Sequence, residues 1–365
     1  MWPFRESCGS LKMTVSPSFV GNFVASFVDS KSHPTTMNAI EPARRPAISL
    51  APLRGITVAA FRRLHAERFG GVDYAVAPFI PLVAGARVMP KLLADVLPEA
   101  CGAVRTVPQV IGKDPAALRV MAQALQDLGY AEMNLNCGCP WKMVARKGRG
   151  SGLPENEDVF LRMLEAGCEA MPDGFSIKIR LGMKTKDTLA RLAPRIAEHP
   201  LKEIAVHPRT GVQMYEGDVD LDAFAAVLPI LPMPVVYNGD VRTLADYARI
   251  VARFPGLAGV MIGRGLIADP ALGESIRAWE DGGRGEVKTP PRDPARVAAF
   301  AAELYATYRA TLCGPSPVLG RMKELWGHLH VYFEDGPARL RAVQRSHSFA
   351  DYERAVNGLG TSAIR

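Results

Sequence analysis

The fold of this chain is decided by one stretch, Tyr130-Ala131-Glu132-Met133-Asn134-Leu135-Asn136-Cys137-Gly138-Cys139-Pro140. Apolar and polar side chains alternate from Tyr130 to Leu135, which predicts a buried strand, and Gly138 and Pro140 end that strand abruptly. Cys139 is therefore expected on a loop that follows a strand end. Loops of this kind often carry chemistry, because a rigid scaffold holds them in place.

The next part of the chain is basic and rich in glycine. Lys142, Arg146, Lys147 and Arg149 occur with no acidic residue between Trp141 and Gly150. A thiol beside cations holds a proton that it can give or lose. The alternative is that Cys137 and Cys139 are small core residues and that the bases face solvent. The pattern of the other strand ends favours the chemical interpretation.

Eight short β-rich runs alternate with helical patterns from residue 46 onward. The runs are residues 47–51, 72–78, 105–111, 131–137, 175–180, 203–207, 234–237 and 259–262. Helical patterns separate most of them, for example at residues 115–128, 157–171, 221–228 and 244–254. Eight such units predict an α/β fold of the TIM type, a (β/α)8 barrel, rather than a doubly wound sheet. The active site is then expected at the carboxyl ends of the strands.

Polar residues and glycines gather at those predicted strand ends. They are Pro52, Gln109, Asn136, Cys139, Lys178, Arg180, the run His207-Pro208-Arg209-Thr210, the run Asn238-Gly239-Asp240 and the run Gly263-Arg264-Gly265. The last two runs are suited to phosphate, because a glycine-rich turn that opens a helix presents free N–H groups to an anion.

Composition limits the class of protein. The chain has 365 residues, of which 48% are hydrophobic and 22% charged, enough for one large domain and a smaller one. No apolar run reaches the roughly 18 to 20 residues of a membrane span, and no convincing signal peptide is present, so a cytoplasmic location is expected. The six cysteines are scattered and expected to be reduced, and no metal is expected because no Cys-x-x-Cys pair occurs. The net charge of +7 weakly favours an acidic partner such as RNA.

The chain divides into four parts. Residues 1–45 are rich in Ser, Pro and Thr and are expected to form a loose extension, unless translation starts near Met37. Residues 46–280 form the predicted barrel, and the Gly- and Pro-rich residues 281–293 form a linker. Residues 294–365 are predicted to form a small all-α helical domain, with helical patterns at residues 296–311, 318–332, 337–345 and 349–357. Its basic residues are consistent with either a solvated face or RNA contact.

Seven motifs, in order along the chain, resemble those of the flavin-dependent tRNA-dihydrouridine synthases. They are residues 50–55, 108–112, 134–140, 178–182, 207–210, 238–240 and 261–265. The resemblance covers roughly residues 47–279 and implies a barrel that binds FMN, followed by a helical RNA-binding domain. By this resemblance, the residues that contact FMN are Pro52, Leu53, Arg54, Gln109, Asn136, Lys178 and His207 around the ring, with Asn238, Gly239, Asp240, Gly263 and Arg264 at the ribityl chain and phosphate.

The resemblance also implies a reaction. NADPH, or NADH, reduces FMN, a hydride passes to C6 of a uridine in the D-loop of tRNA, and Cys139 protonates C5 as the general acid. The residues expected to contact RNA are Lys142, Arg146, Lys147, Arg149, Arg209, Arg321 and Lys323. The basic and aromatic stretch around Arg321 is similar to the corresponding stretch in the subgroup of the family that acts on uridine 16. A monomer without membrane contact is expected.

Three departures from the family pattern leave the choice of substrate open. Residues 77–79 read Ala-Pro-Phe where many members have Thr-Glu, Leu53 replaces a Met, and Cys137 replaces a bulky residue. Cys137 is also an alternative acid. The other functions considered are a small-molecule FMN oxidoreductase of the dihydroorotate or dihydropyrimidine dehydrogenase type, a dihydrouridine synthase acting on ribosomal RNA, and a non-catalytic RNA-binding protein on a decayed barrel.

Overall fold

The computed structural model of the chain describes residues 45–288 and 291–357. The extension expected over residues 1–45 and the alternative start at Met37 fall, apart from Arg45, outside the described residues. The last eight residues of the predicted helical domain also fall outside them.

Ten parallel strands form one sheet in the order β3-β5-β6-β7-β8-β9-β10-β1-β2-β4. They are β1 (Ala47–Leu50), β2 (Tyr74–Val76), β3 (Ile80–Pro81), β4 (Thr106–Val107), β5 (Gln109–Ile111), β6 (Met133–Cys137), β7 (Phe175–Gly182), β8 (Glu203–Thr210), β9 (Val235–Tyr237) and β10 (Gly259–Ile262). The predicted strands are all present, and each lies within a few residues of its expected bounds.

The sheet closes into a barrel because two of its positions are each filled by two short segments. β2 and β3 succeed one another across residues 77–79, and β4 and β5 are separated only by Pro108. β4 pairs with β2, whereas β5 pairs with β3 and β6, so the ten segments occupy eight positions around a ring. Proline interrupts the third position because it has no N–H to give to the ladder. The predicted (β/α)8 barrel is confirmed.

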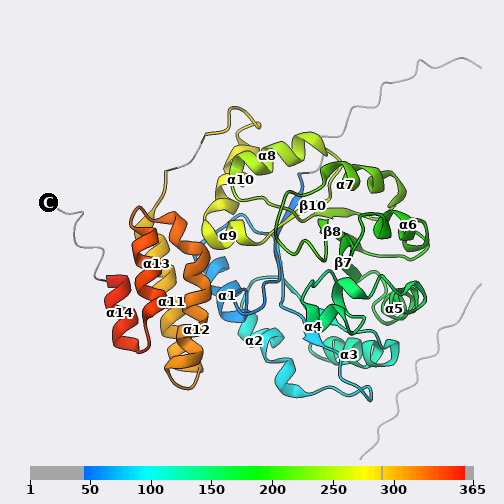
Figure 1. Cartoon of the computed structure of the whole chain (residues 1–365), viewed down its shortest axis with the longest axis horizontal. Coiled ribbons are helices and arrows are strands. Elements are labelled where there is room, and N and C mark those ends of the chain that lie inside the picture. Colours follow the sequence, from blue (N-terminus) through cyan, green and yellow to red (C-terminus); the bar gives the residue numbers. More distant parts are fainter. Residues whose placement is uncertain (1–44, 289–290, 358–365) are drawn as a thin grey trace, which may run out of the picture. The chain divides into compact units, whose positions relative to one another are not determined.

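Helices surround the strands, as Figure 1 shows for the labelled helices around β7, β8 and β10. They are α1 (Ala59–Arg68), α2 (Pro98–Cys101), α3 (Pro115–Asp127), α4 (Lys142–Ala145), α5 (Glu157–Ala170), α6 (Asp187–Ile196), α7 (Leu221–Val227), α8 (Leu244–Arg253), α9 (Arg264–Ala268) and α10 (Leu272–Asp281). Short 3-10 turns lie at Pro90–Leu92, Ala94–Val96, Gly150–Gly152, Leu228–Ile230 and His330–Tyr332.

The barrel helices begin where a side chain can satisfy the free backbone N–H groups of a first turn. Asp114 accepts hydrogen bonds from the backbone of α3, Asn156 from that of α5 and Asp220 from that of α7. Thr243 and Asp246 form a reciprocal capping box at the start of α8. These caps fix the points at which the chain turns from a strand end into a helix.

The barrel has two buried layers of apolar side chains. A small cluster comes from or next to six strands and consists of Ala51, Tyr74, Val76, Val107, Ala205, Val236 and Met261. A much larger cluster packs the outer faces of the strands against the helices. The interior is therefore filled by side chains, and space for a ligand lies above it at the strand ends.

The last part of the chain is helical, with α11 (Pro294–Thr311), α12 (Pro315–Leu329), α13 (Gly336–Arg345) and α14 (Phe349–Asn357). Residues 282–288 and 291–293 contain no helix or strand. Phe300 of α11 is fully buried and packs edge-on against Phe61 and Phe69, so α11 is docked on the barrel through aromatic contacts. Trp326 is buried within the bundle and donates to the Tyr352 hydroxyl at 3.1 Å.

Over the stretches that the structure describes, no helix combines the length and the apolar character needed to cross a bilayer.

Candidate active site

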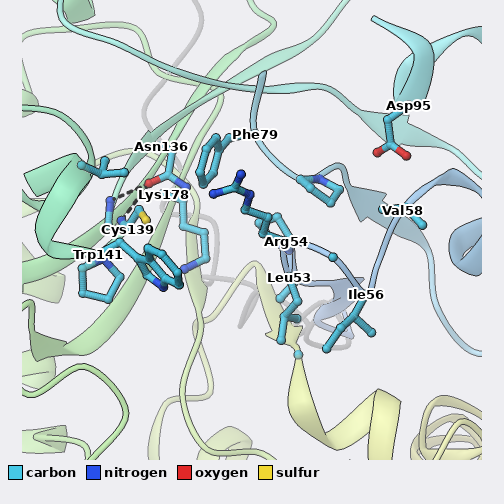
Figure 2. Close-up of a pocket in the computed structure, with 18 of the residues that line it drawn as sticks. Leu53, Arg54, Ile56, Val58, Phe79, Asp95, Asn136, Cys139, Trp141 and Lys178 are labelled. Carbon is cyan, nitrogen blue, oxygen red and sulfur yellow. Dashed lines mark hydrogen bonds between the residues drawn. The ribbon is translucent and has the colours of Figure 1, made fainter. Parts of the chain in front are cut away.

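A cavity of about 1020 Å³ lies at the carboxyl ends of the strands. Most of the predicted site residues line it, namely Pro52, Leu53, Arg54, Asn136, Cys139, Lys178, His207, Asn238, Gly239, Asp240, Gly263, Arg264 and Arg321. They come from loops far apart in the sequence, and they meet because parallel strands end at the same rim. Figure 2 shows Leu53 and Arg54 across the cavity from Asn136, Cys139 and Lys178.

The Cys139 loop is held by the side chain of Asn136. The Oδ1 atom of Asn136 accepts the backbone N–H groups of Gly138 at 3.1 Å and Cys139 at 2.8 Å, drawn as dashed lines in Figure 2. The Ser151 hydroxyl donates to the Cys139 carbonyl at 3.0 Å. The loop therefore has a fixed conformation that leaves the sulfur half-buried in the cavity wall.

The Cys139 thiol keeps its proton at neutral pH. Burial raises the pKa of Cys139, and this outweighs the opposite effects of the Trp141 backbone N–H and of the nearby cations, first among them Arg180. Cys137 is fully buried, its pKa is also raised by burial, and it does not line the cavity. Cys139 is therefore placed to give a proton to a ligand, and Cys137 is not.

Two cations from β7 approach the same point. Burial, together with the neighbouring Arg180, lowers the pKa of Lys178 to about 7. Arg180 joins two loops, because its Nε atom donates to the Gly138 carbonyl at 2.9 Å and its Nη1 atom donates to the Met214 carbonyl at 2.7 Å. Arg180 therefore fixes the Cys139 loop against the loop that follows β8.

His207 faces this group as a neutral ring. Burial lowers its pKa well below the ordinary value, and the positive charges of Arg180 and Lys178 lower it further. Its Nδ1 atom is buried and has no hydrogen-bond partner among the described residues. A buried polar atom without a partner is unusual in a folded protein and is consistent with a site that a ligand completes.

The ends of β9 and β10 form the far side of the cavity. Gly239 has no room for a side chain, because a Cβ atom there would lie 2.0 Å from the Tyr237 hydroxyl. Burial opposes ionisation of Asp240, but its hydrogen bond to Arg209 and the nearby Arg264 lower its pKa. Asp240 thereby holds Arg264 at the cavity edge, where the guanidinium lies 5.0 Å from the centre of the Tyr215 ring.

The helical part of the chain contributes one wall of the cavity. Pro317, Gly320, Arg321 and Glu324 of α12 line it. Arg321 donates to the carbonyl of Gly55, whose φ of +89° lies in the left-handed region. A Cβ atom at position 55 would meet the Glu324 carboxylate, so the loop after β1 and α12 fit closely against each other.

The sequence of this chain matches one family of known proteins. Residues 49–310 match the family described as Dihydrouridine synthase (Dus). This chain belongs to the dihydrouridine synthase family. It is 33% identical to a probable tRNA-dihydrouridine synthase of Rhodobacter capsulatus, over 81% of this chain and 89% of that protein. It is 30% identical to a tRNA-dihydrouridine(16) synthase of Cupriavidus necator, over 86% and 97%. Among solved structures, the old yellow enzyme from Trypanosoma cruzi is similar with a TM-score of 0.48 at 12% identity, over 71% and 94%.

The resemblance drawn from the sequence motifs is thus confirmed, but the structure corrects two residues assigned from them. Arg209 was expected to contact RNA, yet its side chain is 1% exposed and pairs with Asp240 and with the Gly217 carbonyl. That expectation is wrong, because β8 continues to Thr210 and carries Arg209 into the buried sheet. Gln109 was expected to contact FMN, but it is fully buried and is not among the residues that line the cavity. Gln109 instead bonds Asn134 and Asn136.

Of the other residues predicted to contact RNA in this dihydrouridine synthase family member, Arg321 lines the cavity. Four others follow the Cys139 loop in the sequence, and Lys323 is on α12. Lys142, Arg146 and Lys147 are exposed, whereas Arg149 and Lys323 are partly buried. The salt bridges between described residues include none of these five. Their charges are thus available to an anionic partner.

Three residues of the cavity were not assigned a role from the sequence. Arg180 was noted at a strand end, but its function of joining two loops depends on the position of the β8 loop. Tyr215 and Trp141 line the cavity from loops whose course could not be predicted. The only sequence signal for Trp141 was a large aromatic residue within a basic loop.

Proposed function

We propose that this protein reduces a uridine in the D-loop of tRNA to 5,6-dihydrouridine, with FMN as its cofactor and NADPH or NADH as the reductant. Family membership supports the reaction class, and the relatives that act on uridine 16 make this position the proposed target. The observation that carries the chemistry is the protonated thiol of Cys139 in the same cavity as Lys178. The proposed enzyme acts as a monomer in the cytoplasm.

The residues of the cavity fit FMN. Its volume of about 1020 Å³ accommodates a flavin together with a nucleobase. Lys178, Asn136 and His207 would hold the ring, and the unpartnered Nδ1 of His207 is a free polar atom there. Gly239, Gly263 and Arg264 would hold the phosphate, because glycines leave the backbone open and Arg264 brings positive charge. When bound, FMN supplies the hydride that reaches C6 of the uracil.

The protein contributes the proton and the position of the substrate. Cys139 gives its proton to C5 of the uracil as the C5–C6 double bond is reduced, which completes dihydrouridine. The raised pKa of the thiol suits this role, because a thiolate has no proton to give. Lys178 adds positive charge that favours an electron-rich ring in the cavity.

The uridine reaches the cavity only if it leaves its stack. Enzymes that act on a base in folded nucleic acid extrude the nucleotide into a pocket. The exposed basic residues Lys142, Arg146 and Lys147 lie in the segment that begins two residues after Cys139. There they can bind the phosphates on either side of the extruded nucleotide.

The test is to incubate the purified protein with NADPH and RNA from cells that lack its gene, and to map dihydrouridine by mass spectrometry. Cys139→Ala is expected to retain FMN but to form no dihydrouridine, whereas the matched change Cys313→Ala, at an exposed thiol, is expected to leave activity unchanged. The same map distinguishes tRNA from ribosomal RNA and identifies the modified position.

Two results contradict the proposal. Activity close to that of the unchanged protein in Cys139→Ala would remove the assigned acid. Oxidation of NADPH by the flavoprotein without dihydrouridine in any RNA would direct attention to small-molecule acceptors such as orotate.

A further inference from the structure

Large apolar side chains are exposed mainly around the mouth of the cavity. Of the nine such residues among those described, five lie in two segments that follow strands, Trp141 and Met143 at the start of α4 after β6, and Val212, Met214 and Tyr215 in the loop after β8. Trp141 is 58% exposed and Met143 is 73% exposed. Trp141 and Tyr215 line the cavity itself, and exposed apolar side chains that gather beside a cavity are typical of binding sites.

The two segments are held next to each other by the fold. Arg180 donates to the carbonyls of Gly138 in one loop and Met214 in the other, and the N–H group of Val212 donates to the Met183 carbonyl at 2.9 Å. Trp141 and Tyr215 line the same cavity. The apolar rim is therefore built in advance, which lowers the entropy lost on binding.

Trp141 differs from the other described tryptophans in having no structural partner. The Nε1 atoms of Trp279 and Trp326 donate to the Gly285 carbonyl and the Tyr352 hydroxyl. Trp141 makes no such hydrogen bond and no ring contact within the part of the chain that the structure describes. Tyr215, in contrast, is contacted by the guanidinium groups of Arg180 and Arg264, 5.4 and 5.0 Å from the centre of its ring. The indole ring of Trp141 is therefore exposed and makes no contact of these kinds with the described residues.

The position of Trp141 points to a nucleobase as its partner. Its backbone N–H faces the Cys139 sulfur, and Figure 2 shows its ring in the same part of the cavity as Cys139 and Lys178. Exposed cations follow it directly in the same loop. Aromatic rings that bind bases, beside cations that bind phosphates, are the common arrangement of sites for unpaired RNA. An apolar protein surface would leave these cations without partners.

We propose that Trp141 stacks on an unpaired nucleobase adjacent to the target uridine and, with Met143, holds the RNA loop open while that uridine occupies the cavity. This inference rests on the proposed function for the identity of the RNA. It assigns Trp141 a role in positioning the substrate and leaves the chemistry to Cys139 and the cofactor.

The test compares Trp141→Ala with Trp141→Phe in the flavin-loaded protein. Trp141→Ala is expected to raise KM for tRNA roughly 5- to 150-fold with little change in kcat, the range that base stacking on an aromatic ring spans. Trp141→Phe, which keeps a ring, is expected to restore most of the affinity. Val120→Ala, which changes an exposed apolar residue of α3, serves as the matched control. Flavin content and NADPH oxidation without RNA are measured for all three variants, and Val120→Ala is expected to leave both unchanged.

A second measurement separates this inference from the proposed function. A labelled D-arm hairpin is bound by the flavoprotein, and its affinity is followed by fluorescence anisotropy, with and without an abasic site next to the target uridine. The abasic site is expected to weaken binding to the unchanged protein and to have little further effect in Trp141→Ala, because both changes remove the same contact. Additive effects, or equal affinity of Trp141→Ala and the unchanged protein, would overturn the stacking role. Because this readout is binding, it decides the role even if no dihydrouridine is formed.

Discussion

A chain of buried side chains links the centre of the barrel to the Cys139 loop, and Gln109 is its middle member. Gln109 donates from Nε2 to Oδ1 of Asn134 at 2.8 Å, and its Oε1 accepts from Nδ2 of Asn136 at 2.8 Å. Asn134 in turn donates to the Ser176 hydroxyl at 2.8 Å. Asn136 is the residue that holds the backbone of Cys139. The orientation of Asn136 therefore depends on Gln109.

Gln109→Leu keeps the approximate volume of the side chain and removes both hydrogen bonds. Asn134 then has a buried oxygen without a donor, and Asn136 has a buried amide without an acceptor. Each unpaired group costs about 1–3 kcal/mol, so the free energy of unfolding is expected to fall by roughly 2–6 kcal/mol. Because Asn136 is free to turn, the sulfur of Cys139 moves, and a displacement of about 1 Å at a reacting group lowers turnover on the order of 100-fold.

Urea unfolding gives the first quantity, and single-turnover formation of dihydrouridine by the flavin-loaded protein gives the second. Ser176→Ala is the graded control, because it removes only the far end of the chain and leaves Gln109 and Asn136 paired. It is expected to cost stability but to retain turnover. If Gln109→Leu is destabilised and still turns over at the original rate, the network supports the fold and does not position Cys139.

Three further changes test the energetics of the site and of the helical part. The lowered pKa of Lys178, about 7 against 10.5, means that the cofactor-free fold binds fewer protons than the unfolded chain between these values, so stability rises with pH across this window. Lys178→Met should therefore raise the stability of the cofactor-free protein by roughly 4–5 kcal/mol at pH 6 and by about 1 kcal/mol at pH 10, and equal shifts in thermal melts at both would contradict this. Asp240→Asn leaves the buried Arg209 without its carboxylate, and urea unfolding at pH 7 should show a loss of roughly 3 kcal/mol that shrinks in acid as Asp240 itself becomes protonated. Phe300→Ala empties the aromatic contact between α11 and the barrel and should cost roughly 3–5 kcal/mol, whereas a loss below 1 kcal/mol would show that this contact is not a main support.

Most strands could be predicted because they are apolar runs bounded by residues that break strands. β10, Gly259–Ile262, lies at its predicted bounds. The third run, residues 105–111, was expected as one strand and is divided in two, and the second run, residues 72–78, is followed by an additional short strand, β3, just beyond its predicted end. The division at Pro108 follows from its missing N–H group, but which neighbour each half pairs with depends on the closed ring, and no local pattern contains that information.

The site could be predicted as far as strand ends determine it. Cys139, Lys178 and His207 were brought together correctly, because the ends of parallel strands meet at one rim. Gln109 was expected at the cavity but lies deeper in the barrel. It pairs in register with Asn134, two residues before Asn136. Arg209 was misplaced because β8 is longer than its apolar run suggests. The loop positions of Trp141 depend on contacts made by Arg180, which a single sequence does not reveal.

Because α12 forms one wall of the cavity, the shape of the active site depends on both the barrel and the C-terminal helices. Arg321 donates a hydrogen bond to the Gly55 carbonyl in the loop after β1, and Glu324 leaves no room for a side chain at position 55. Leu53 and Arg54, which precede Gly55 in that loop, line the cavity. A substitution on α12 therefore affects the cavity residues of the loop after β1. A substitution near Gly55 in turn affects how α12 packs against the barrel. The two parts therefore cannot change independently. Replacing the helical region by that of a relative would change the wall of the substrate cavity and would require a matching loop after β1.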